Sequence, residues 1–120
     1  MTIQTARFQA PTTFEMLETF GIDPVVSDPD EGLAAYEWTD GSGLTLRLSW
    51  SLFERSVQVS LRLGDRELAT VCQEGAVWLS ADSSKGRPAL WGDFEQGGAR
   101  GRLTVEVQPA LKVHWSILDI

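Results

Sequence analysis

The stretch Val57-Gln-Val-Ser-Leu-Arg-Leu63, then Gly64-Asp65, then Arg66-Glu-Leu-Ala-Thr-Val-Cys72 decides the fold of this chain. Apolar and polar residues alternate in its two halves, which is the pattern of β-strands with one buried face. A two-residue loop that opens on glycine is a favoured hairpin turn, so the two halves are predicted to pair antiparallel. The register that follows from this turn gives three cross-strand pairs: Leu61 with Leu68, Val59 with Thr70, and Arg62 with Glu67.

Six further segments with strand-like patterns are predicted to be Leu33–Thr39, Leu44–Ser51, Ala76–Asp82, Pro88–Phe94, Arg102–Val107 and Ala110–Leu118. The connections between them are too short for crossover helices, so neighbouring strands should run antiparallel. The predicted fold is therefore mainly β (α+β): an antiparallel meander of about eight strands, sandwich- or half-barrel-like, with one short N-terminal helix.

A second hairpin is predicted to join two of these strands through a loop of odd length. Tyr36 and Trp38 on one strand share a face with Leu46 on the next only if the number of loop residues is odd. We therefore place a three-residue loop at Asp40–Ser42. This loop pairs Trp38 with Leu44 and Tyr36 with Leu46.

One short helix is predicted between Thr12 and Gly21. Thr12 followed three residues later by Glu15 is the pattern of a capping box, and Gly21 is a helix C-terminal signal. Glu15 and Glu18 should lie on the solvent face. The apolar stripe expected to pack against the sheet consists of Phe14, Leu17 and Phe20, with Met16 beside them.

The length of 120 residues and the 42% apolar content predict a single domain, residues 1–120, with its own hydrophobic core. A single cysteine cannot form an internal disulfide, and the N-terminal residues do not resemble a signal peptide. No apolar run approaches the ~20 residues of a membrane span. These observations predict a cytoplasmic protein.

The net charge of −7 is confined to the first third of the chain, where Arg7 is the only basic residue. Such an acidic segment steers a basic partner and repels phosphates and anionic membranes, which argues against nucleic-acid and membrane binding. The predicted partner-binding residues are the eight acids of this segment: Glu15, Glu18, Asp23, Asp28, Asp30, Glu31, Glu37 and Asp40. Apolar anchors near them would supply affinity, and the nearest aromatic candidates are Phe20, Tyr36 and Trp38.

Residue patterns for catalysis or cofactor binding are weak. His114 alternates out of phase with its apolar neighbours, and Cys72 is expected on the buried face, where a thiol is inert. The acids of 28–32 lack the ligand spacing of a calcium loop. The glycine-rich segment Gly97–Arg102 precedes a strand, not the helix that a phosphate loop requires, and is read as a mobile hairpin loop. We therefore predict no cofactor, no metal site and no enzymatic activity.

The tryptophans are numerous for this length. Four of the five fall in strand-like runs and are expected in the core: Trp38, Trp50, Trp78 and Trp115. Trp91 shares the parity of Ala89 and Asp93, so it is the candidate for an exposed position.

Three features together suggest a family: the capped helix Thr12–Gly21, the acidic segment Asp23–Asp40, and the strand series through Val57–Leu63 and Glu74-Gly75-Ala76. In these the chain resembles the small, acidic, cytosolic proteins that bacteria encode as immunity partners of secreted toxins. The resemblance contains no signature motif, so it transfers no functional residue. It implies a binding protein that neutralises a basic protein partner, most simply a toxin domain.

Two other functions remain open at this point. One is a small-molecule-binding or catalytic β-domain with its site in the mouth of a curled sheet. The other is a structural or oligomerising module. The sequence does not predict the oligomeric state.

Overall fold

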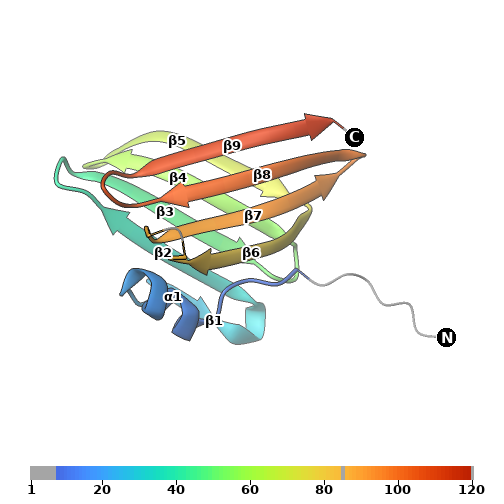
Figure 1. The fold of residues 1–120 in the computed structure, drawn as a ribbon, viewed down its shortest axis with the longest axis horizontal. Helices are drawn as coiled ribbons and strands as arrows, with labels where there is room; N and C mark the ends of the chain where they lie inside the picture. The colour runs from blue at the N-terminus through green and yellow to red at the C-terminus, as the bar shows by residue number, and fades with distance from the viewer. Residues whose placement is uncertain (1–7, 85, 120) are drawn as a thin grey trace.

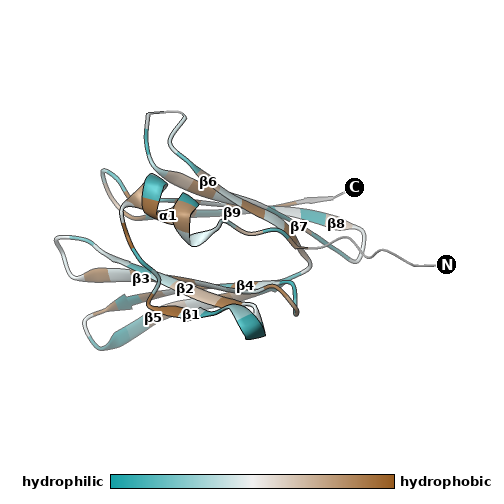
Figure 2. Ribbon diagram, turned by 90° about the horizontal axis from the view of Figure 1, so that it is seen from below, coloured by the Kyte–Doolittle hydropathy of each residue, from teal (hydrophilic) through white to brown (hydrophobic). Residues whose placement is uncertain are grey.

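The computed structural model describes residues 8–84 and 86–119. Within them the chain forms a five-stranded sheet and a four-stranded sheet that face each other, with one short helix along one side (Figures 1 and 2). The elements in chain order are α1 (Thr13–Phe20), β1 (Val26–Asp28), the 3-10 helix η1 (Pro29–Glu31), β2 (Leu33–Thr39), β3 (Leu44–Ser51), β4 (Ser56–Leu63), β5 (Arg66–Glu74), β6 (Ala76–Asp82), β7 (Ala89–Gln96), β8 (Ala99–Glu106) and β9 (Lys112–Asp119).

Both sheets are meanders in which each strand pairs antiparallel with the next, in the orders β1-β2-β3-β4-β5 and β6-β7-β8-β9. The predicted fold class is confirmed, and a sandwich of two open sheets is the form it takes. The described residues contain one strand beyond the eight predicted, the three-residue β1. An isolated parallel bridge also occurs where Gln9 lies along β6, donating to the Val77 carbonyl and accepting from the Leu79 N–H.

The core lies between the two sheets and is built from their inward-facing side chains. Tyr36, Leu46 and Leu48 come from one sheet and Leu90 and Leu103 from the other, all fully buried. The Tyr36 ring also stacks on Trp50, with 5.6 Å between ring centroids. Burial of these side chains from both sheets makes the sandwich a single packed unit.

Helix α1 begins and ends as predicted but buries a different face. The Thr12 hydroxyl accepts from the Glu15 N–H at 3.1 Å, and the Thr12 N–H donates to the Glu15 carboxylate at 3.0 Å, which completes the capping box. The predicted contact face is confirmed at Phe20 but wrong at Phe14 and Leu17, which are exposed. Met16 is fully buried in their place, and Phe20, one turn later on the same side, packs edge-on against Trp38.

In the β4–β5 hairpin the predicted turn and the predicted Arg62–Glu67 pair next to it are confirmed, but the two pairs predicted farther from the turn are wrong. Arg62 pairs with Glu67 across Gly64-Asp65, whereas Leu61 pairs with Ala69 and Val59 with Val71. One extra residue, Leu68, bulges from β5 between the two pairings, and beyond it every β5 side chain changes face. Cys72 is therefore exposed, not buried.

The β2–β3 hairpin keeps the predicted faces with a register shifted by two residues. Trp38 pairs with Leu46 and Tyr36 with Leu48, and the predicted pairs with Leu44 and Leu46 are wrong. The loop is longer than expected because the Asp40 carboxylate folds it, accepting from the N–H groups of Ser42 at 2.9 Å and Leu44 at 3.1 Å. Five residues lie between the paired residues Thr39 and Thr45 instead of three. The number is still odd, so the inward residues stay inward.

The connection between β7 and β8 is also tighter than predicted. Gly97 and Gly98, both with positive φ, form a two-residue turn, and β8 begins directly after them at Ala99. The residues 99–101, expected in a mobile loop, are therefore part of a strand, and Arg100 becomes a sheet residue. This correction places two arginines on one face of the four-stranded sheet, as described next.

Candidate functional site

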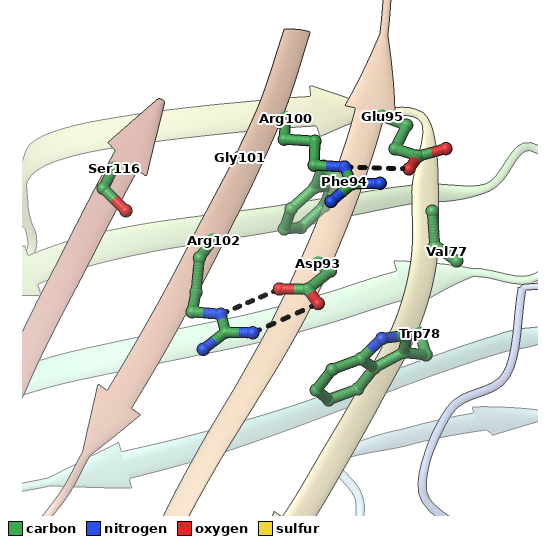
Figure 3. Close-up of a pocket in the computed structure, with 9 residues that line it drawn as sticks. All are labelled: Val77, Trp78, Asp93, Phe94, Glu95, Arg100, Gly101, Arg102 and Ser116. Carbon is green, nitrogen blue, oxygen red and sulfur yellow. Dashed lines mark hydrogen bonds and ion pairs between the residues drawn. The ribbon is translucent and has the colours of Figure 1, made fainter. Parts of the chain in front are cut away.

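The outer face of the four-stranded sheet carries a row of polar and aromatic side chains. Cross-strand pairing places Trp78 of β6 opposite Asp93 of β7, Asp93 opposite Arg102 of β8, and Arg102 opposite Ser116 of β9. Because paired residues point to the same side of a sheet, all four side chains lie together on the solvent side (Figure 3). The strands thereby assemble a site from four separate segments of sequence.

Two ion pairs organise this face. The Arg102 guanidinium donates to both oxygens of Asp93, with N–O distances of 2.8 and 3.2 Å, and this contact raises the pKa of Arg102 further above its usual range. One row away, Arg100 donates to Glu95 at 3.2 Å. Both arginine side chains remain more than half exposed. Each pair is therefore worth only about 0–1 kcal/mol and is open to exchange with a ligand.

Two concavities flank Arg102. One of about 500 Å³ is lined by Trp78, Asp93 and Arg102, and the other of about 540 Å³ by Trp91, Arg102 and Glu106. Tryptophan beside arginine is the composition of protein–protein hot spots. The face can accept an apolar group on its indoles and a polar group on its ion pairs.

Sequence reasoning missed this site because Trp78 was expected in the core. Ala76 pairs with Phe94 and Trp78 with Asp93, which are adjacent residues of β7. Val77, between Ala76 and Trp78, is therefore an extra residue in β6. The bulge turns Trp78 to the outer face, so the prediction that Trp78 lies in the core is wrong. An alternation count has no signal for a single inserted residue.

The other tryptophans divide as follows. Trp38 and Trp50 are buried, as predicted. Trp115 is half-buried on the inner face, where its ring stacks on Phe94 at 5.7 Å between centroids. Trp91 is half-buried on the outer face beside Asp93, in agreement with its predicted parity.

His114 and Cys72 lie on opposite sides of the sandwich. His114 is exposed opposite Thr104 on the outer face of the four-stranded sheet, as its phase predicted. Cys72 is exposed opposite Gln58 on the outer face of the five-stranded sheet. Within residues 8–84 and 86–119, no three His, Cys, Asp or Glu side chains are grouped so as to hold a metal ion.

The eight acidic residues of the predicted partner site extend along one side of the molecule. Glu15 and Glu18 lie on α1, Asp23 follows α1, and the others lie from the end of β1 to the β2–β3 loop. Asp28, Asp30 and Glu31 lie before β2 and Asp40 after it. A seven-residue strand spans about 23 Å, so the acids before and after β2 form two separate groups.

Half of these acids also have a partner inside the protein. Glu15 caps α1, and the Asp28 carboxylate accepts from the Glu31 N–H at 3.3 Å to cap η1. Glu37 is paired with Arg47 at 2.9 Å. Hydrogen bonds from Ser42, first its hydroxyl and then its backbone, hold the pKa of Asp40 below its usual value. The exposed remainder consists of Glu18, Asp23, Asp30 and Glu31.

The aromatic anchors expected beside the acids are mostly unavailable. Tyr36 and Trp38 are core residues, 1% and 9% exposed. Burial raises the pKa of the Tyr36 hydroxyl, and the charge of Asp23 raises it further. Phe20 is half-buried against Trp38. An apolar anchor for a partner must therefore come from other residues.

Comparison with known proteins gives one informative likeness. No protein-family model and no curated protein matches the sequence. The fold is similar to a chain of a contact-dependent growth inhibition toxin–immunity protein complex from Klebsiella pneumoniae 342, with a TM-score of 0.81 and 20% sequence identity. The likeness covers 92% of this chain and 96% of that chain. In the described part of the protein, no helix has the length and apolarity to cross a bilayer. At this identity the likeness establishes a shared fold.

Proposed function

We propose that this chain is an immunity-type protein that binds a toxin domain and neutralises it. The observation that supports the proposal most is the fold likeness to a chain of a toxin–immunity protein complex, which extends over nearly the whole length of both chains. The two-sheet arrangement, the capped helix and the acidic first third agree with the family resemblance of the sequence. The cytoplasm is the proposed place of action, as for the proteins that the chain resembles.

The proposed partner is basic. The formal charge of −7 belongs to residues 1–40, and the described acids of that segment lie on α1 and along β1, η1 and β2. A field of this sign raises the association rate with a basic protein by roughly 10–10³-fold at low salt. Exposed ion pairs contribute little affinity, about 0–1 kcal/mol each, so the acids set the rate of encounter more than the strength of the complex.

Neutralisation is proposed to occur by binding alone, without chemistry on the toxin. His114 and Cys72 are the two side chains best suited to nucleophilic or general-base catalysis, and they lie on the outer faces of different sheets. A nucleophile and its base must lie within hydrogen-bonding reach, about 2.6–3.2 Å. The placement of these two residues supports a purely steric inhibitor.

The test uses the C-terminal domain of the protein encoded by the gene directly upstream of this one, called the upstream domain below. Its expression in a bacterial host should arrest growth, and co-expression of this chain should restore growth. Co-expression of an unrelated acidic protein of similar size serves as the control for charge and should not restore growth. A domain that is harmless, or growth arrest that this chain does not relieve, would contradict the proposal.

A further inference from the structure

Four large, partly exposed apolar side chains lie on β1, at the start of β2 and in the loop between β3 and β4. In Figure 1, β1 forms one edge of the five-stranded sheet. Phe53, in the loop between β3 and β4, is 70% exposed, and the other three are between about a third and a half exposed. This set is called the apolar patch below and consists of Val26, Leu33, Leu52 and Phe53. Exposed aromatic and aliphatic groups gathered at one place are typical of interaction surfaces.

Strand pairing and a backbone hydrogen bond bring the segments that carry the patch together. Val26 and Leu33 lie diagonally across the β1–β2 pairing and point to the same outer face. The Leu52 N–H donates to the Gly32 carbonyl at 2.9 Å, which holds the loop against the start of β2. A Cβ on Gly32 would stand 3.5 Å from the Phe53 ring, so this ring lies directly beside Gly32. Glycine is favoured at this position because its φ is 66° and because a Cβ would stand only 3.2 Å from the Leu52 Cβ.

A concavity adjoins the patch on the same outer face. It measures about 300 Å³ and is lined by Val26 and Leu33 on one side and by Gln58 and Cys72 on the other. Its floor includes Ala35, which is almost completely buried. The patch and the concavity share Val26 and Leu33, so apolar side chains of the patch lie beside a hollow of side-chain size.

Carboxylates surround this surface. Asp28, Asp30 and Glu31 lie in and beside η1, immediately before Gly32, and Glu54 follows Phe53 and lines the concavity. Arg47 also lines the concavity but is paired with Glu37 at 2.9 Å. The five carboxylates named here, Asp28, Asp30, Glu31, Glu37 and Glu54, outnumber the two arginines of the same segments, Arg47 and Arg55. The rim of the patch is therefore acidic.

We infer that the apolar patch is the docking site for a basic segment of the toxin domain, an inference that rests on the proposed function. Lysine and arginine side chains lay their aliphatic stems on apolar surface and direct their charged ends to carboxylates. The aliphatic stems would pack on the patch, and the charged ends would pair with the acids of η1 and with Glu54. Phe53 is the central anchor, because it is the most exposed ring beside the acidic rim.

The experiment measures binding of the purified upstream domain to variants of the full chain. Phe53→Ser is expected to raise the Kd by about tenfold or more, the size of a hot-spot loss. Phe14→Ser is the matched control, because Phe14 is 69% exposed on α1, near the Trp38 end of β2 and away from the patch. This control should leave the Kd within about twofold of the original.

Hydrogen exchange locates the interface independently of mutation. Binding of the upstream domain should slow backbone exchange in residues 26–33 and 51–54. It should leave unchanged the outer face of the four-stranded sheet around Trp91 and Arg102. Protection confined to that second face would overturn the inference, because the Trp78–Arg102 site would then be the contact surface.

The outcomes separate this inference from the proposed function. If the unaltered chain does not bind the upstream domain, the proposed function fails and this inference fails with it. If the chain binds and Phe53→Ser binds equally well, this inference alone is wrong. A chain that is dimeric in solution and becomes monomeric on Phe53→Ser, with toxin binding unchanged, would identify a second copy as the occupant and also contradict it.

Discussion

The backbone N–H of Glu95 donates to the carbonyl oxygen of Gly75 at 2.9 Å, at the point where the chain passes from one sheet to the other. Gly75 has a φ of 80°, and a Cβ there would stand 2.3 Å from the carbonyl oxygen of Glu95. The link between the sheets lies this close to β7 only because the linking residue is glycine. The relationship ties a local backbone requirement to the assembly of the sandwich.

Gly75→Ala is therefore expected to lower the free energy of unfolding by about 3 kcal/mol or more, since it combines backbone strain with a steric overlap that no side chain can relieve. Gly64→Ala is the matched control, because Gly64 also has positive φ but has nothing within 4 Å of a Cβ. It should cost only about 1 kcal/mol. Urea unfolding measures both, and equal losses in the two variants would contradict the account of Gly75.

The corrected face of α1 gives a second prediction. Met16 is fully buried between the helix and the sheets, so Met16→Ala should lower the free energy of unfolding by about 2–5 kcal/mol. Leu17→Ala removes a similar volume from the next position, where 47% of the side chain is exposed, and should change stability by about 0.5 kcal/mol or less. A larger loss from Leu17→Ala than from Met16→Ala would restore the contact face predicted from the sequence.

The Asp40 loop predicts a pH dependence. Hydrogen bonds from Ser42 and Leu44 lower the pKa of Asp40 in the folded protein below its ordinary value of 3.8. Because the pKa of Asp40 is lower in the folded state, its ionised form stabilises the protein at pH values above the ordinary pKa. This contribution is lost as the pH falls through the pKa of the folded state. The difference in thermal stability between the original protein and Asp40→Ala should therefore be largest near neutral pH.

Thermal melts of both proteins at neutral pH and at about pH 2 measure this difference, because all other carboxyl groups are common to the pair. Asp40→Asn serves as the control, since its amide oxygen still accepts hydrogen bonds without a charge. At neutral pH Asp40→Asn should lose less thermal stability, relative to the original protein, than Asp40→Ala does. A deficit of Asp40→Ala that is the same at both pH values would show that the charge of Asp40 does not stabilise the loop.

The proposed steering by acidic residues predicts a salt-dependent rate. Replacing Asp23, Asp28, Asp30 and Glu31 by their amides removes four exposed charges. After Asp28→Asn the side-chain amide oxygen at this position can still accept from the Glu31 N–H and cap η1. Association with the upstream domain should slow at low salt, and the rates should converge near 1 M salt, where the screening length is about 3 Å. Stopped-flow mixing at several salt concentrations measures this, and equal rates at low salt would show that these acids do not steer association.

The parts of the fold that sequence reasoning predicted are those that depend on local signals. The capping box of Thr12, the Gly64-Asp65 turn and the span Ala76–Asp82 follow from neighbouring residues and agree with the structure. Alternation also assigned Tyr36 and Trp38 correctly to the inner face. These features need no knowledge of which strand packs on which.

The failures share a different cause. Leu68 and Val77 are single extra residues in strands, and each reverses the faces of its neighbours. As a result Cys72 is exposed and Trp78 lies half-buried on the outer face. Periodicity does not reveal a bulge, because both phases fit the pattern equally well. The choice of Met16 over Phe14 depends on where α1 packs against β6 and Trp38, a contact between distant parts of the chain.

The candidate sites were predictable only in part. The acidic composition pointed to one side of the molecule, but the separation of Asp28 and Asp40 by the whole of β2 required the structure. The apolar patch combines Val26, Leu33 and Phe53 from three segments, and no local pattern unites them. Likewise the Arg102–Asp93 pair depends on the register of β7 and β8.

The most direct test of the central claim is a titration of this chain into a fixed concentration of the purified, active upstream domain. An immunity-type protein that acts by binding alone should abolish the toxin's activity at a molar ratio near one to one, and the toxin should remain chemically intact by mass spectrometry. Toxin activity that persists in the presence of excess folded chain would contradict the account. So would inhibition by far less than one equivalent with a covalent change in the toxin, because that outcome requires an enzyme.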